Sequence, residues 1–400
     1  MQRSYKIGYF VTNNIQHIPP VIALYPYIGG VVFTDNRWVY KHLVTKYAEL
    51  NIPVVYKTMR RQLQREILRQ RIRVMLYPSY HTLYFGKAVQ IFHGGLSDKT
   101  YVESLLILLY DLVLFPGEKT RDKVARSDYL KRIPEWKIVG YPKFDPLING
   151  SLYAAPLFQN TRKTILYAPT WLSQKRPYVS KVVSFSSYGE SSLELWALDI
   201  IRELSRRFNV CIKYHSRIYR EPGDIYDQVD ALIKELDVSE YVKVARDDNI
   251  LPYMARANLM ISDMSTACYE WFHFDRPIVF ANPSPEHYKR SDDISSNTYA
   301  WQAGDVINAK EDILKFVRKN LARDEYREIR NRIFRYAVFQ PDGRATERQA
   351  RAITDFYERY EHVPYVWLMI TTFAVHKWRR LIIVVRNRYY RLLKKEKIGR

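Results

Sequence analysis

The chain has 400 residues, of which 63 are Lys or Arg and 42 are Asp or Glu, so its formal net charge at pH 7 is +21. With 47% hydrophobic and 26% charged residues, it has the composition of a folded protein, and its length favours two domains. Such a positive field attracts polyanions, namely nucleic acid, anionic lipid or phosphorylated small molecules. Two Cys exclude a disulfide framework and a structural zinc site built on a Cys cluster.

Short apolar runs alternate with helical stretches over the first 150 residues, which predicts a parallel sheet with helices on both faces. The apolar run at 7–11 is too short for a signal peptide, and Asn13 and Asn14 follow it, so we expect the protein to stay in the cytoplasm. The predicted strands are 5–11, 30–34, 52–56, 74–77, 88–92, 111–115 and 136–139, and the helices include 36–49 and 58–72.

A stretch of small and polar residues at 149–161 interrupts this pattern, which then starts again. The second set has strands at 164–169, 209–214, 241–244, 258–262 and 277–281, and helices at 191–207, 224–236 and 265–274. We therefore expect an α/β protein with two doubly wound domains, residues 1–150 and 160–350. Ligands of such sheets bind beyond the carboxyl ends of the strands, so a cleft between the domains is the expected site.

The segment 362–400 concentrates apolar, aromatic and basic residues. Its apolar run at 363–375 would cover ~20 Å as a helix, which is short of a ~30 Å hydrocarbon core. A longer span would bury Lys377, Arg379 and Arg380 at a cost of ~2.5–3.5 kcal/mol each.

We therefore expect this segment to lie on an anionic membrane surface as a basic, aromatic amphipathic tail. Trp367 and Trp378 would sit at headgroup depth, and Arg379 and Arg380 would contact lipid phosphates. The alternative is a solvated helix packed on the globule.

Known phosphate and zinc motifs are absent, since the chain has no G-x-G-x-x-G, no Walker A and no H-E-x-x-H sequence. Polar clusters follow the predicted strands instead. The first is His93, which comes after the strand at 88–92 and precedes Gly94 and Gly95. A histidine facing the cleft there can accept a proton near neutral pH. The alternative is a turn with a solvent-exposed histidine.

Two further clusters follow strands of the second domain. Thr170 would point its hydroxyl into the cleft. His215, Arg217 and Arg220 follow the strand at 209–214. They form a candidate clamp for a diphosphate, because one guanidinium group can bind two phosphate oxygens at once.

The last cluster consists of Asp263, Ser265 and Thr266, between the strand at 258–262 and the helix at 265–274. Backbone N–H groups and two hydroxyls at a helix start can bind an anion, although ordinary capping explains the same residues. Together, the clusters predict a cleft that binds a nucleotide diphosphate.

The ordered set of motifs resembles the CDP-glycerol glycerophosphotransferases, the family of teichoic acid primases and polymerases. The motifs are HGG at 93–95, GYPKFD at 140–145, YAPTW at 167–171, His215, SDMST at 262–266, RPIVFAN at 276–282 with Tyr288, and DGRATERQ at 342–349. The resemblance implies a two-domain GT-B fold, CDP-glycerol as donor, a saccharide on undecaprenyl diphosphate as acceptor, and peripheral membrane association.

The resemblance also assigns roles to single residues. His93 matches the proposed base of the family, and His215 matches a second histidine whose usual proline neighbour is missing here. Ser265 and Thr266 keep two hydroxyls of a family motif, and Glu270 takes the place of an Asp that usually follows it.

We therefore expect a membrane-surface phosphotransferase in which an acceptor hydroxyl attacks the β-phosphorus of a CDP-polyol and CMP leaves. His93 would take the proton, and His215 would hold the diphosphate. The other residues expected to bind the donor or its phosphates are Thr170, Arg217, Arg220, Asp263, Ser265, Thr266 and Glu270. No metal or cofactor is implied.

Two other classes of function remain open. A GT-B sugar transferase or a nucleotide-sugar 2-epimerase would use a nucleotide diphosphate sugar in the same cleft. A non-catalytic basic protein would bind nucleic acid or membranes, but no nucleic-acid motif accompanies the charge, so we expect no nucleic-acid partner. The acceptor, the number of transfers and the oligomeric state are left open.

Overall fold

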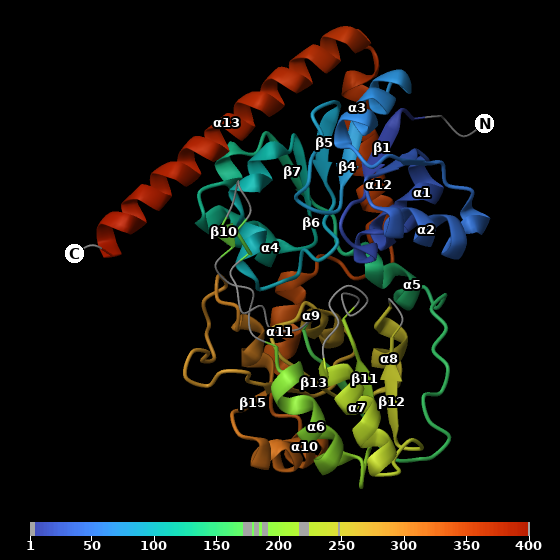
Figure 1. Ribbon diagram of the computed structural model, residues 1–400, viewed down its shortest axis with the longest axis vertical. Helices are drawn as coiled ribbons and strands as arrows, with labels where there is room; N and C mark the ends of the chain where they lie inside the picture. The colour runs from blue at the N-terminus through green and yellow to red at the C-terminus, as the bar shows by residue number, and fades with distance from the viewer. Residues whose placement is uncertain are drawn as a thin grey trace.

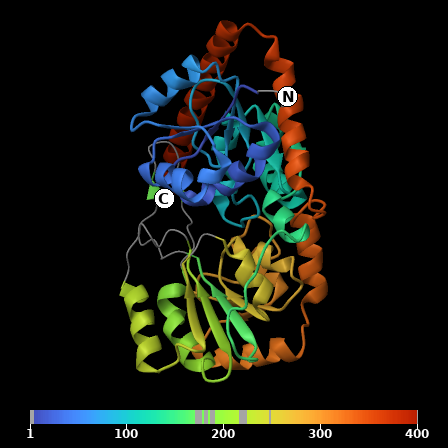
Figure 2. The same ribbon diagram turned by 90° about the vertical axis from the view of Figure 1, so that its right-hand side faces the viewer.

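The computed structural model describes residues 5–170, 178–179, 184–185, 191–215, 224–246 and 249–398. Arg217 and Arg220 lie outside this set. The described chain forms two α/β domains stacked along the long axis of the molecule (Figures 1 and 2).

The first domain is built on a seven-stranded parallel sheet in the order β3-β2-β1-β4-β5-β6-β7. Its strands are β1 (Ile7–Phe10), β2 (Val31–Thr34), β3 (Val54–Tyr56), β4 (Val74–Tyr77), β5 (Lys87–Gln90), β6 (Leu112–Phe115) and β7 (Glu135–Ile138). Its helices are α1 (Pro19–Ile28), α2 (Arg37–Lys46), α3 (Arg60–Arg69), α4 (Glu118–Arg126) and α5 (Asp145–Ile148). In the central strand β1, Tyr9 is in register with Val32 of β2 and Leu76 of β4.

The second domain has a six-stranded parallel sheet in the order β12-β11-β8-β13-β14-β15 and a short antiparallel pair, β9 and β10. Its strands are β8 (Thr164–Ala168), β9 (Tyr178–Val179), β10 (Ser184–Phe185), β11 (Asn209–Lys213), β12 (Val242–Ala245), β13 (Leu259–Ser262), β14 (Ile278–Ala281) and β15 (Asp305–Ile307). Its helices are α6 (Leu193–Leu204), α7 (Asp224–Glu235), α8 (Leu251–Arg256), α9 (Ala267–Phe272), α10 (Ile313–Ala322) and α11 (Arg327–Ala337).

Every strand predicted from the sequence is present. The prediction missed the short pair β9 and β10 and, in the second parallel sheet, β15. Its three residues begin with Asp305, so it lacks the apolar run that marks the other strands. Neighbouring residues of a strand point to opposite faces, so Tyr9 belongs to the core on one side of the first sheet and Phe10 to the core on the other. Both faces are buried, which is why parallel strands appear in the sequence as continuous apolar runs.

The chain returns to the first domain after α11, a crossing that the sequence did not indicate. Helix α12 (Ala345–Glu361) places Ile353, Phe356 and Tyr357 in the core beside α1. Figure 2 shows this return along one side of the molecule, in orange to red.

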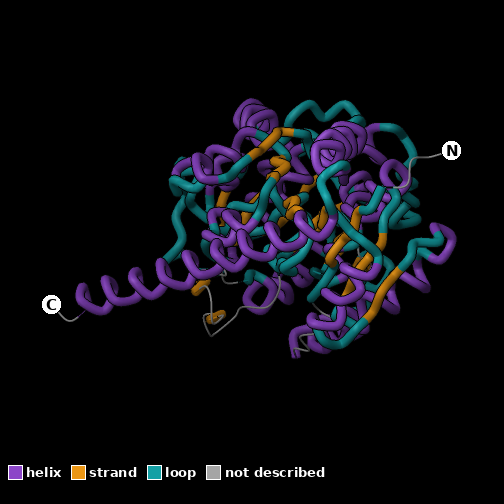
Figure 3. Tube along the Cα trace, turned by 90° about the horizontal axis from the view of Figure 1, so that it is seen from above, coloured by secondary structure: helices purple, strands orange, loops and turns teal. Residues whose placement is uncertain are grey.

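The predicted tail is one long helix, α13 (Tyr365–Ile398), which crosses the first domain and projects beyond it (Figures 1 and 3). Leu368, Met369 and Ile383 on one of its faces are buried. Nε2 of His376 lies 2.9 Å from Oγ1 of Thr82, which fixes the helix to the domain. No helix among the described residues is both long and apolar enough to cross a membrane.

The tail residues predicted to face lipid divide between the two sides of this helix. Trp367 and Trp378 are 62% and 63% exposed. Arg379, in contrast, forms an ion pair of 3.0 Å with Asp111, and Arg380 donates to the carbonyl oxygen of Thr82. The prediction that both arginines lie on the lipid-facing side of the helix is therefore wrong, because their contacts with Asp111 and Thr82 turn both toward the first domain.

Candidate active site

A cavity of about 1300 Å³ lies between the two domains, at the carboxyl ends of both sheets. The first domain contributes residues that follow β4 and β5, and the second contributes residues that follow β8, β11 and β13. In both sheets the strand order reverses at a central strand, β1 or β8, and such switch points open a crevice for ligands. The cavity therefore lies where the strand pattern predicts it.

His93 lines the cavity, and its hydrogen bonds define which ring nitrogen carries the proton. Nδ1 lies 2.7 Å from the carbonyl oxygen of Pro78, which can only accept, so Nδ1 donates. Nε2 then accepts from the amide of Gln16, at 3.3 Å, and the ring of His17 packs 4.2 Å away. The imidazole thus presents a basic nitrogen, as general-base chemistry requires.

Gly94, the residue after His93, lies close to the second domain. A Cβ atom added at Gly94 would lie 3.3 Å from the hydroxyl of Tyr101, a tight contact, and 3.9 Å from Oγ1 of Thr266, an ordinary one. The two walls of the cavity therefore approach each other beside His93.

Thr170, His215, Ser265 and Thr266 line the opposite wall. Oγ1 of Thr170 accepts a 3.0 Å hydrogen bond from Nζ of Lys99, a buried cation of the first domain. Oγ of Ser265 also accepts from the backbone N–H of Ala267, at 3.3 Å, so capping and cavity lining coexist.

Asp263 does not line the cavity, which corrects its predicted role in donor binding. The side chain is fully buried, and its carboxylate accepts from the backbone N–H groups of Thr170 and Ser192, both at 3.0 Å. The hydroxyl of Ser192 donates to it as well, at 2.9 Å. Burial raises the pKa of Asp263, although these hydrogen bonds and Lys99 act in the opposite direction. Asp263 therefore positions Thr170 and does not reach a ligand.

Glu270 lines the cavity, and its predicted part in donor binding stays a prediction. Its carboxylate accepts from Nζ of Lys143, at 2.8 Å for both oxygens, and from the hydroxyl of Tyr141, at 2.8 Å. A carboxylate accepts hydrogen bonds and repels phosphate oxygens, so Glu270 does not itself hold phosphate, and through these contacts it joins α9 to the first domain.

The cavity is strongly cationic. Six Lys and Arg side chains line it, against one carboxylate, Glu270, among the described residues. The cations are Lys46, Arg60, Lys99, Lys143, Lys213 and Arg380. Sequence reasoning placed none of the six at this cavity, because they come from separate segments, and it predicted Arg380 as a lipid contact instead. The net charge indicated an anionic ligand but not which cations gather around it.

In the described ranges, no group of three or more His, Cys, Asp or Glu side chains is arranged to hold a metal ion. The expectation that the reaction needs no metal stays a prediction.

Two facing Rossmann-like domains define a fold of the GT-B type. The family model of the CDP-glycerol:poly(glycerophosphate) glycerophosphotransferases matches residues 110–355, more than half of the chain. The chain therefore belongs to this family of transferases, as its motifs predicted.

Solved structures share this fold. The wall teichoic acid polymerase TagF, in a variant soaked with CDPG, superimposes with a TM-score of 0.59 at 14% identity, over 89% of this chain and 90% of that chain. MnaA of S. aureus with UDP has a TM-score of 0.55 at 14% identity, over 88% and 97%. A putative UDP-N-acetylglucosamine 2-epimerase of Listeria monocytogenes has a TM-score of 0.56 at 13% identity, over 88% and 96%. No curated protein sequence matches the chain.

Proposed function

We propose that the protein transfers glycerol phosphate from CDP-glycerol to a hydroxyl of a lipid-linked saccharide or growing cell-surface polymer and releases CMP. The observation that carries the proposal is the cationic cavity, which is lined by His93, with a basic Nε2, on one wall and by Thr266 on the other. Family membership supports CDP-glycerol as the donor.

The proposed step is an in-line displacement. The acceptor oxygen forms a bond to the phosphorus that carries the glycerol, while the bond from this phosphorus to the bridging oxygen of CMP breaks. The acceptor proton goes to Nε2 of His93. Cations fixed beforehand, such as Lys99 and Lys213, stabilise the charge that develops on the leaving phosphate.

The donor is proposed to lie against the second domain, where Thr170, His215, Ser265 and Thr266 line the wall. Arg217 and Arg220 remain candidates for the diphosphate clamp. Acceptor chemistry is proposed for the first domain, which carries His93.

Mass spectrometry of the products formed from CDP-glycerol and a panel of lipid-linked disaccharides tests the proposal. We expect acceptors that gain one or more glycerol phosphate groups, together with an equal amount of CMP. A screen of donors by calorimetry addresses the alternative of a sugar transferase or 2-epimerase, whose fold is also similar. Binding of UDP-sugars without binding of CDP-glycerol would overturn the proposal.

We further propose that the protein is attached to the cytoplasmic membrane surface through the outer face of α13. This face is apolar and exposed, and its large residues are Val366, Trp367, Ile370, Phe373, Val375, Trp378, Leu381, Ile382 and Val385. Such a face on a basic helix suits the interface of an anionic bilayer. No metal or cofactor forms part of the proposed reaction.

A further inference from the structure

Helix α13 contributes to the wall of the cavity as well as to the outer surface. Arg380, Leu381, Ile383 and Val384 line the cavity from this helix, which lies beyond the residues matched by the family model. The transfer chemistry proposed above gives these residues no role, and their combination of one cation and three apolar side chains calls for an explanation.

Arg380 is held firmly but keeps part of its donor capacity. Its Nη2 donates to the carbonyl oxygen and to Oγ1 of Thr82, at 2.8 and 3.0 Å, and its guanidinium packs over the ring of Tyr84, 4.7 Å from the centroid. Its Nε is buried without a hydrogen-bond partner among the described residues. A buried donor of this kind is costly unless a ligand completes it.

Arg60 of α3 lines the same cavity. Its Nε pairs with Asp35 at 2.9 Å, and the guanidinium packs 5.5 Å from the centroid of the Phe10 ring. Asp35 pairs with Arg60, and no carboxylate among the described residues is bonded to Arg380. The two arginines therefore carry an excess of positive charge.

His81 also lines this part of the cavity, and it does not add to that charge. Burial and repulsion by Arg60, against the attraction of Asp35, lower the pKa of His81 to about 4, and Arg380 acts in the same direction as Arg60. The imidazole is therefore neutral at neutral pH. Hydrogen bonds bring both arginines to this side chain. Arg380 bonds Thr82, the residue after His81, and Asp35, the partner of Arg60, accepts from Thr12, next to Asn13, which bonds His81.

An apolar path connects this region to the outside. Leu381 lines the cavity and is 54% exposed, so it belongs both to the cavity wall and to the outer face that carries Trp378 and Val385. A ligand with an anionic head and a long apolar chain can thus place its head at the arginines while its chain follows α13 outward.

We propose that Arg60 and Arg380 bind the phosphate of the acceptor, and that an apolar chain on that acceptor lies along Leu381 and Val384. The proposal rests on the proposed function, because it assigns a place to the second substrate of the same reaction. It separates an acceptor phosphate site in the first domain from the donor phosphates in the second.

The test compares Arg60→Gln and Arg380→Gln with the matched control Lys377→Gln. Lys377 lies on the same helix and packs over Tyr84, 5.2 Å from the centroid, but it does not line the cavity. With CDP-glycerol and a diphosphate-linked disaccharide on a short prenyl chain, each arginine variant should raise the acceptor KM about 10- to 100-fold. The Kd for CDP-glycerol, measured by calorimetry, should stay unchanged in all three.

A second experiment shows whether the bound phosphate belongs to a prenyl-linked acceptor or to a water-soluble polymer. Leu381→Gln should raise the KM only for the prenyl acceptor, whereas a water-soluble glycerol phosphate oligomer should be used as before. Equal KM values for the prenyl acceptor in wild type and Leu381→Gln would overturn the path along α13.

The outcomes separate this inference from the proposed function. If the wild-type protein neither binds nor consumes CDP-glycerol, the proposed function fails. If it is active and both arginine variants keep the wild-type acceptor KM, only the acceptor site is wrong. A rise confined to Arg380→Gln and accompanied by a lower Tm would also overturn it, because it would reflect looser docking of α13.

Discussion

At the scale of single residues, hydrogen-bond partners decide which polar side chains can take part in chemistry. Nδ1 of His93 is bonded to a carbonyl oxygen, which makes Nε2 the basic nitrogen, and the amide of Gln16 donates to it. Asp263 comes from an equally suggestive motif, but Thr170 and Ser192 occupy its carboxylate. The same kind of sequence signal thus marks a residue that lines the cavity in one case and a structural residue in the other.

Replacement of His93 tests the general-base assignment. We expect His93→Ala to lower turnover ~10²–10⁴-fold, because the acceptor hydroxyl loses its base, while the Kd for CDP-glycerol changes little. Turnover of the wild type should also fall on acidification, since imidazolium cannot accept a proton. Single-turnover rates, donor Kd and Tm measured on one preparation separate this result from misfolding. The exposed His287→Ala is the control, and near-wild-type turnover of a folded His93→Ala protein would end the assignment.

Asp263 and Ser265 should respond in opposite ways. In Asp263→Asn, an amide N–H group would face backbone donors, so we expect a loss of about 1–3 kcal/mol in the free energy of unfolding and a lower Tm. Ser265→Ala should keep the Tm and weaken CDP-glycerol binding by about 1–2 kcal/mol. Thermal unfolding and calorimetry measure both. If Asp263→Asn weakened binding without any loss of stability, Asp263 would contact the donor after all.

At the scale of elements, α13 combines two surfaces that a linear sequence shows as one mixed segment. Trp367 and Trp378 are eleven positions apart, about three helical turns, so they share the exposed face. Leu368, Thr372 and His376 are buried on the face that packs against the first domain. Deleting the helix would therefore expose core residues, and point changes on the outer face make a cleaner test of membrane attachment.

We expect the double variant Trp367→Ser/Trp378→Ser to bind anionic vesicles at least about tenfold more weakly, because it loses two large apolar anchors. High salt should weaken binding of the wild type by screening the basic residues. Vesicle sedimentation measures both effects. Trp38→Ser on α2, where Trp38 is 48% exposed, should bind like the wild type. Equal binding by the double variant and the wild type would contradict attachment through α13.

Docking of α13 should depend on pH through His376. Burial, with Arg380 and Arg379 nearby, lowers its pKa to about 3, below the ordinary value of 6.5. The unfolded chain therefore binds a proton that the folded protein excludes, so stability present above pH 6.5 is lost as the pH falls toward 3.

His376→Gln should flatten this dependence, because its amide can still bond Thr82 but does not titrate. Tm values measured between pH 7.5 and 4.5 give the slope of Tm against pH for the wild type and for His376→Gln. His287→Gln, at an exposed histidine, is the control. Parallel slopes for the wild type and His376→Gln would show that His376 does not carry the effect.

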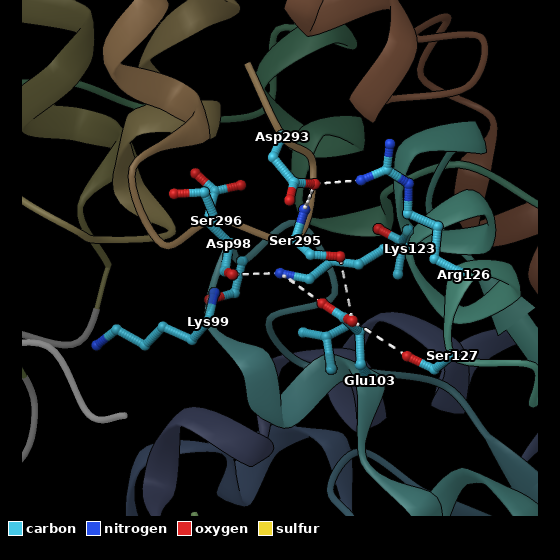
Figure 4. A network of polar contacts seen from close by, with 12 residues as sticks. Asp98, Lys99, Glu103, Lys123, Arg126, Ser127, Asp293, Ser295 and Ser296 are labelled. Atoms are coloured by element: carbon cyan, nitrogen blue, oxygen red, sulfur yellow. Dashed lines mark hydrogen bonds and ion pairs between the residues drawn. The ribbon is translucent and has the colours of Figure 1, made fainter. Parts of the chain in front are cut away.

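At the scale of the whole molecule, a buried polar network joins the two domains. Asp98 pairs with Lys119 at 2.6 Å and accepts from the hydroxyl of Tyr269 and from the backbone of Ala300 in the second domain. Figure 4 shows the polar contacts next to Asp98. Glu103 contacts Lys123 and Ser127 of the first domain and Ser295 of the second, and Arg126 pairs with Asp293. Lys99 points away from this network, and it is bonded to Thr170.

Asp98→Asn should weaken the contact between the domains. Burial already lowers the pKa of Lys119 to about 8, although Asp98 counteracts this, and the variant would leave the buried cation without its partner. Breaking a buried pair costs about 3–5 kcal/mol, so calorimetry should show a lower Tm or two separated transitions. The exposed Asp128→Asn should behave as the wild type. A single transition at the wild-type Tm would contradict a role of Asp98 in joining the domains.

The sequence by itself determined the fold class, the strands of the two parallel sheets except β15, and the strand-end positions of His93, His215, Ser265 and Thr266. These features depend on local chemistry, namely apolar runs, turn residues and the polar residues that follow a strand. Its net charge also indicated an anionic partner.

Only the tertiary structure decided which side chains face the cavity. Lys99, Arg60 and Arg380 come from a loop, a helix and the tail, and no local pattern marks them as neighbours. Asp263 and Arg379 matched their patterns, but partners distant in the chain, Thr170 and Asp111, occupy them. Whether a polar group serves a ligand depends on competition with the rest of the fold for its hydrogen bonds, and that competition is settled only when the two domains and α13 pack together.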